Sequence, residues 1–166
     1  MKKYTVLAIL VFILFSGCQS LPEPKEDHGL LIFQVKAENN SQLDYLTWYK
    51  LKLNSGDDLI SLYPHTGFTM RMLPSGSYTV NTIESIPNVR NVTTGTPQNV
   101  TIQFEILPKQ ITYFQFRLDV KQGPDPRREN YTIQNQNWRP LARSDIYNLS
   151  KQIEKYEGVD LWINQY

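Results

Sequence analysis

The sequence predicts a mainly β protein, an antiparallel β-sandwich of about seven or eight strands with one C-terminal α-helix. From residue 29 onward, apolar and polar residues alternate over short segments, which is typical of strands that bury one face. Turn-forming residues separate these segments at short intervals, as they do in β-sandwiches. Helical spacing of apolar residues comes late in the chain, after residue 143.

Strands are predicted wherever apolar residues recur at every second position, because successive strand side chains point to opposite faces. The four clearest patterns cover residues 31–37, 47–53, 100–106 and 114–120. Weaker patterns cover residues 59–63, 68–73, 78–86 and 131–138. Turns are expected at residues 54–57, 74–76, 107–109 and 123–126, where Gly, Pro, Asn and Asp gather. Residues 87–98 form a long polar stretch, which we expect to be a loop or an irregular edge strand.

The C-terminal helix is expected at about residues 145–157. Ser144 is a suitable N-cap, and Asp145 would lie favourably at the positive end of the helix dipole. Ile146, Leu149 and Ile153 recur at helical spacing, and Gly158 would end the helix. A single apolar stripe indicates that this helix packs on a sheet face or over an open end of the sandwich.

Residues 68–80, with the sequence FTMRMLPSGSYTV, carry a resemblance to a known fold. An apolar strand, a Pro-x-Gly turn and a Tyr-x-Val strand follow one another here, and this stretch resembles the strand-turn-strand of transthyretin-like (prealbumin-like) sandwiches. The resemblance implies that Gly76 lies in the turn and that Tyr78 and Val80 point inward. It implies no catalytic residue. An immunoglobulin-like sandwich is the alternative architecture for the same strand pattern.

The N-terminus has the layout of a secretory signal. Lys2 and Lys3 precede an apolar run over residues 4–15, which is shorter than the roughly 20 residues of a membrane-spanning helix. Small residues then lead to Cys18, the only cysteine of the chain.

The sequence FSGC at residues 15–18 resembles the lipobox of bacterial lipoproteins. The resemblance implies cleavage after Gly17, a diacylglyceryl thioether on the sulfur of Cys18, and usually a further acyl chain on the new N-terminus. The alternative is a secreted protein with an unrelated cysteine, but a lone thiol in an oxidising compartment is unusual. Gln19 after the cysteine points, by analogy with lipoprotein sorting, to the outer membrane and a periplasm-facing anchor; the inner membrane and the cell surface are alternatives.

Three parts of the chain follow from these patterns: a signal peptide at residues 1–17, a lipidated tether at 18–28 and a β-sandwich domain at 29–166. The tether carries two prolines and four charged residues, and it would extend to at most about 35 Å. Removal of the first 17 of the 166 residues leaves 149, which is enough for one domain with its own core.

Charge and motifs exclude several function classes. After removal of the signal, 15 basic residues face 16 acidic ones without a basic tract, which argues against a nucleic-acid partner. The sequence has no Gly-x-Ser-x-Gly motif or glycine-rich phosphate loop, so we expect no catalysis. His28 and His65 lack partners at ligand spacing, and Asp57 and Asp58 fit a solvated turn, so no metal site is expected. The covalent lipid on Cys18 is the only non-protein group expected.

Two hypotheses for function remain open. The first is a non-enzymatic envelope lipoprotein whose sandwich binds a protein partner through a free sheet edge or the loops at one end. The second is a carbohydrate-binding module for peptidoglycan or another envelope glycan. Its candidate stacking residues are Trp48, Trp138 and Trp162; the alternative is that Trp138 and Trp162 pack under the helix and Trp48 fills a sheet edge. Arg127 and Arg128 could meet an acidic partner or a phosphate, or form part of a solvated face.

Overall fold

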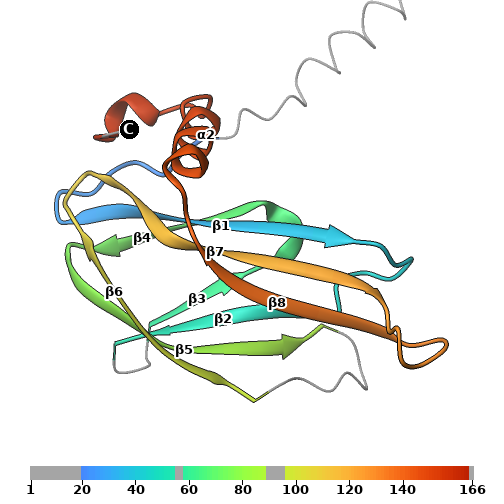
Figure 1. Ribbon diagram of the computed structural model, residues 1–166. Coiled ribbons are helices and arrows are strands. Elements are labelled where there is room, and N and C mark those ends of the chain that lie inside the picture. Colours follow the sequence, from blue (N-terminus) through green and yellow to red (C-terminus); the bar gives the residue numbers. More distant parts are fainter. Residues whose placement is uncertain (1–19, 55–57, 89–95, 165–166) are drawn as a thin grey trace, which may run out of the picture.

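A computed structural model describes residues 20–54, 58–88 and 96–164, and within them two four-stranded sheets face each other (Figure 1). The first sheet has the order β4 (Phe68–Pro74), β1 (His28–Asn39), β7 (Ile111–Pro124) and β8 (Thr132–Pro140). The second has the order β3 (Asp58–Leu62), β2 (Thr47–Leu53), β5 (Gly76–Pro87) and β6 (Gln98–Ile106). Helix α2 (Arg143–Ile153) and the short 3-10 helices η1 (Pro64–Thr66) and η2 (Val159–Leu161) complete the fold. The predicted mainly β class with two sheets and one C-terminal helix is confirmed.

The sandwich is not purely antiparallel, as the sequence pattern had suggested. Strands β1 and β7 lie side by side and run parallel, with Val35 opposite Leu118, whereas every other strand pair in the two sheets is antiparallel. The turn after β6 passes the chain from the second sheet to the first, so β7 enters beside the start of β1 and runs in the same direction. Alternation shows which face of a strand is buried, but it does not encode the direction of its neighbour.

The main core fills the space between the sheets. Alternate residues of the strands supply it, as the sequence predicted, and both Tyr78 and Val80 are buried. Its centre is aromatic: the ring of Phe114 lies 4.4 Å from that of Phe33 and 5.4 Å from that of Phe104, measured between centroids. Such offset and edge-to-face pairs are the favoured arrangements of aromatic rings.

A second core lies on the outer face of the first sheet, under α2 (Figure 1). Leu149 and Ile153 of the helix pack there against Leu30 and Ile32 of β1. Residues 29–33 of β1 are therefore buried on both faces of the sheet, which explains the continuous apolar run at residues 30–33, whereas the second half of the strand alternates.

The boundaries of the helix differ from those expected. Ala142, rather than Ser144, is the N-cap, and the side chain of Asp145 accepts a hydrogen bond from the backbone N–H of Ala142 at 3.0 Å. The same carboxylate pairs with Arg117 Nη1 of β7 at 3.1 Å, so Asp145 both caps the helix and holds it to the sheet. The helix ends at Ile153, and Gly158 instead adopts a left-handed conformation (φ 80°) in the turn before η2.

The segment expected to be a tether differs at residues 20–22. Ser20 forms a parallel bridge with Glu157, and the backbone N–H of Leu21 donates to Glu157 O at 2.9 Å. The side chain of Leu21 is only 6% exposed because it packs in the second core. This contact was not predicted from the sequence, because Leu21 is a single apolar residue among prolines and charged residues. The signal peptide, Cys18 and Gln19 lie outside the described residues.

Candidate functional site

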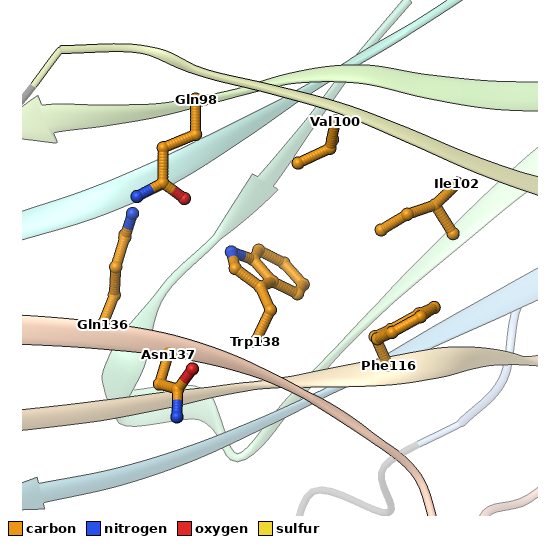
Figure 2. Close-up of a pocket in the computed structure, with 7 residues that line it drawn as sticks. All are labelled: Gln98, Val100, Ile102, Phe116, Gln136, Asn137 and Trp138. Atoms are coloured by element: carbon orange, nitrogen blue, oxygen red, sulfur yellow. The ribbon is translucent and has the colours of Figure 1, made fainter.

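The sandwich is open on the side where β6 and β8 face each other. These two edge strands are not paired with each other, and a hollow of about 360 Å³ lies between them. Its lining is shown in Figure 2 and consists of Gln98, Val100, Ile102, Phe116, Gln136, Asn137 and Trp138. We call this feature the β6–β8 cleft.

Trp138 is the central side chain of the β6–β8 cleft. Its indole lies between the amides of Gln98 and Gln136 on one side and the apolar Ile102 and Phe116 on the other (Figure 2). The indole Nε1 is buried, and it meets no hydrogen-bond acceptor among the described residues. An indole N–H can only donate, and leaving a buried donor unpaired costs about 1–3 kcal/mol. A ligand that supplied an acceptor here would recover this energy.

The polar side of the cleft is built from amides. Gln98 comes from β6, while Gln136 and Asn137 come from β8, and Ser85 Oγ donates to Gln136 Oε1 at 3.4 Å. Amides both donate and accept hydrogen bonds, and none of the seven lining side chains is titratable. The cleft can therefore stack on a flat group and hydrogen-bond to it. Trp138 was a candidate from the sequence, but Gln98 and Gln136 were not. The sequence around a glutamine in a strand does not show whether its side chain faces solvent or a cleft.

The loops at one end of the sandwich form a second hollow of about 490 Å³. Arg127 and Arg128 lie here, in the connection between β7 and β8. Arg127 already contacts Asp125, at 3.5 Å from Nε to Oδ1, and Arg128 lies over the ring of Tyr131 at 5.8 Å. These two arginines thus have neighbours within their own loop and do not reach the β6–β8 cleft.

Gln122 and Gln134, which the sequence did not single out, join the strands and loops at this end of the molecule through hydrogen bonds. The buried amide of Gln122 donates to the backbone oxygens of Leu43 and Asp44, at 3.2 and 2.9 Å. The amide of Gln134 donates to the hydroxyl oxygen of Tyr49 at 2.8 Å. Burial is the main influence on that hydroxyl and raises the pKa of Tyr49 above its usual 10.0, while the hydrogen bonds oppose the shift.

The three tryptophans do not form one platform. Trp48 projects from the outer face of the second sheet, where it stacks on Tyr63 with ring centroids 5.4 Å apart. Trp162 is only 5% exposed and belongs to the second core, where its Nε1 donates to Pro22 O at 2.9 Å. The alternative of core packing therefore holds for Trp162, whereas Trp138 lines the β6–β8 cleft instead of packing under the helix.

The histidines lie apart from the β6–β8 cleft. His28 Nδ1 lies 2.6 Å from Asp27 Oδ1, and this hydrogen bond is the main cause that lowers the pKa of Asp27. His65 is exposed beside Tyr63, at a ring separation of 5.9 Å. Within residues 20–54, 58–88 and 96–164, no three acidic, His or Cys side chains come together as metal ligands would. Asp57 lies outside this part of the chain.

Across the part of the chain that the structure describes, no helix is both long enough and apolar enough to cross a bilayer.

Comparisons with known proteins do not identify a family or a function for this chain. No protein-family model and no curated protein matches the chain. Among solved structures, the chain is similar to part of a leucine-rich repeat protein from Bacteroides thetaiotaomicron, with 18% sequence identity and a TM-score of 0.32. The match covers 56% of this chain and 13% of that chain. At this TM-score the similarity carries no argument about fold or function.

Proposed function

We propose that this chain is a lipid-anchored, non-enzymatic lipoprotein of the bacterial outer membrane, facing the periplasm, whose transthyretin-like or immunoglobulin-like sandwich binds an envelope protein. The lipobox-like sequence ending at Cys18 supports the anchor, and Gln19 favours the outer membrane. The observation that carries the binding role is the β6–β8 cleft, with its buried, unpaired indole N–H.

A protein partner fits this cleft because both of its borders are edge strands. Within the described sheets, β6 and β8 each pair with one neighbour and leave their other edge without a strand. An extended segment of a partner can add to such an edge through backbone hydrogen bonds, and its side chains then enter the adjacent pocket. Trp138 would act as the apolar anchor, a common role for tryptophan in protein interfaces.

The anchor is tested by acylation in a bacterial host. We expect radiolabelled palmitate to enter the wild-type chain and the protein to fractionate with membranes. Cys18→Ser should lose both the label and the membrane association, because serine has no thiol to carry the diacylglyceryl group and stable anchoring needs two or more acyl chains. Circular dichroism of the Cys18→Ser protein should match that of the wild type. Wild-type protein that takes up no palmitate would remove the anchor from this proposal.

The cleft is tested with a photo-cross-linking amino acid placed at two glutamines of the same strand. Gln98 lines the β6–β8 cleft, whereas Gln103 is exposed on the outer face of β6. We expect a discrete cross-linked envelope protein from position 98 and none from position 103. Trp138→Ala should weaken binding of that protein roughly 30-fold, as loss of an interface anchor worth about 2 kcal/mol does. Identical products from both positions would contradict a partner in the cleft.

A glycan is the second candidate for the same cleft, because an indole beside the amides of Gln98 and Gln136 is also suited to a sugar ring. Tryptophan emission is the measurement that separates the two. A peptidoglycan fragment bound in the cleft should change the emission of the wild type and leave that of Trp138→Phe unchanged. An unchanged wild-type spectrum leaves the protein partner as the occupant.

A further inference from the structure

Residues 20–22 are bound to the folded domain. A free tether at residues 18–28 would instead have left the chain unattached until about residue 29. Ser20 and Leu21 pair with Glu157, and the indole of Trp162 holds the carbonyl oxygen of Pro22. These contacts come from the segment that follows α2, which itself packs on the outer face of the first sheet. The start of the described chain is therefore fixed on the helix-bearing side of the molecule.

This attachment leaves almost no free chain for a lipidated Cys18. Only Gln19 separates it from Ser20, and consecutive Cα atoms are about 3.8 Å apart, so the chain length allows at most about 8 Å between the Cα atoms of positions 18 and 20. The acyl chains of a lipoprotein begin at this residue, so the bilayer surface must come close to the side on which Ser20 lies. The domain cannot stand off from the membrane by its own diameter.

That side of the molecule also presents exposed apolar and aromatic side chains. Tyr147 of α2 is 57% exposed, and in the segment after the helix Leu161 is 54% and Ile163 is 51% exposed. Leu161 is near the attachment point, because a Cβ added at Gly158 would lie 3.9 Å from Leu161 Cδ1 and 3.8 Å from Leu21 O. Figure 1 shows α2 and the C-terminal segment together outside the sheet that contains β1 and β7. We call Tyr147, Leu161 and Ile163 the anchor face.

The charges around the anchor face indicate how it would contact lipid. Lys151 pairs with Glu154 at 2.7 Å and lies 5.6 Å from the ring centroid of Tyr147. Exposed Glu157 and Asp160 flank the attachment point and balance exposed Lys109 and Lys155 nearby, so this side has no excess of positive charge that would select anionic lipids. Tyrosine rings and aliphatic side chains instead favour the boundary between headgroups and acyl chains.

We propose that the anchor face lies in the headgroup region of the bilayer and fixes the orientation of the domain. This inference rests on the proposed acylation of Cys18. The first sheet then lies between the membrane and the second sheet (Figure 1). Trp48, on the outer face of the second sheet, points away from the bilayer. The β6–β8 cleft opens to the side, where a partner in the periplasm can reach it.

The test uses the absence of any other cysteine in the chain. Once Cys18 is acylated, a cysteine introduced elsewhere is the only free thiol, and it can carry an environment-sensitive bimane label. The labelled variants are Tyr147→Cys, Leu161→Cys and Ile163→Cys, with Leu43→Cys and Tyr131→Cys as controls. The control residues have comparable exposure, but they lie in the loops of the second hollow.

The lipidated proteins are reconstituted into zwitterionic vesicles with and without brominated lipid. We expect labels on the anchor face to shift their emission to shorter wavelength and to lose intensity with brominated lipid, while the control labels do neither. If labels at positions 161 and 163 stay as solvent-exposed as that at position 43, in protein that mass spectrometry shows to be acylated, the anchor face is overturned and the anchor itself stands. Protein without lipid on Cys18 overturns both.

Discussion

Trp162→Ala is expected to lower the free energy of unfolding by about 3–5 kcal/mol, the usual cost of removing a large buried aromatic side chain. The indole is almost completely buried between the helix-bearing sheet face and the N-terminal segment. Its loss leaves a cavity in the second core and removes the hydrogen bond to Pro22 O. Residues 20–22 and the segment after α2 meet at this side chain, so residues 20–22 should become more accessible to proteolysis as well.

Trp48→Ala is the matched control for this prediction. Trp48 is half-buried on the outer face of the second sheet and stacks on Tyr63, so we expect a loss of about 0.5–1.5 kcal/mol. Trp162→Phe should fall between the two, because it keeps an apolar ring and loses one hydrogen bond worth about 1 kcal/mol. Urea denaturation of the Cys18→Ser form measures all three. Equal losses at positions 48 and 162 would show that the second core contributes little to stability.

Gly29→Ala is expected to destabilise the fold by about 1–3 kcal/mol or more, because the new methyl group overlaps atoms that cannot move away. A Cβ at Gly29 would overlap Leu107 O and lie 2.7 Å from Ile106 Cγ2. The backbone on both sides is held in place, since Leu30 N donates to Gln110 O at 2.9 Å and Lys109 N donates to His28 O at 2.7 Å. Relief of the overlap would break these hydrogen bonds at the entry to β1.

Gly123→Ala provides the comparison, since this glycine also lies in a strand of the first sheet. Its added Cβ would meet Asn40 Cβ at 3.8 Å, an ordinary contact. Alanine also loses less conformational entropy on folding than glycine, so the variant should be neutral or stabilised by up to about 1 kcal/mol. Thermal denaturation of both variants separates the cases, and a Gly29→Ala protein as stable as Gly123→Ala would contradict the close approach of β1 to the turn after β6.

Most of the secondary structure could be predicted from alternation, which reports one buried face per strand. Each of the eight expected strand segments corresponds to a strand in the structure. The helix was predicted in the right region, but its N-cap was assigned to Ser144, the more favourable capping residue by type. Asp145 decides the start instead, because it accepts from the N–H of Ala142 and pairs with Arg117 on β7 at the same time. A contact with another strand is not visible in local sequence.

The candidate site could be predicted only in part. Trp138 was a candidate because tryptophan is suited to stacking, but nothing in the sequence separated it from Trp162, which is buried, or from Trp48 on another face. Gln98 and Gln136 face each other because β6 and β8 border the same open side of the sandwich (Figure 2). They are 38 positions apart in the chain and belong to different sheets, so only the tertiary fold brings them together.

By itself, the sequence determined the β class, the strand segments and the inward-facing residues, because the two-residue period of a strand is a local property. It also supplies the motif at Cys18 on which the proposed anchor rests. Tertiary structure decided the parallel pairing of β1 with β7, the burial of residues 29–33 on both faces of the first sheet and the fixing of Leu21 beside Glu157. Each of these features depends on contacts between segments that are far apart in the sequence. Local sequence patterns do not show which distant segments will pack against each other.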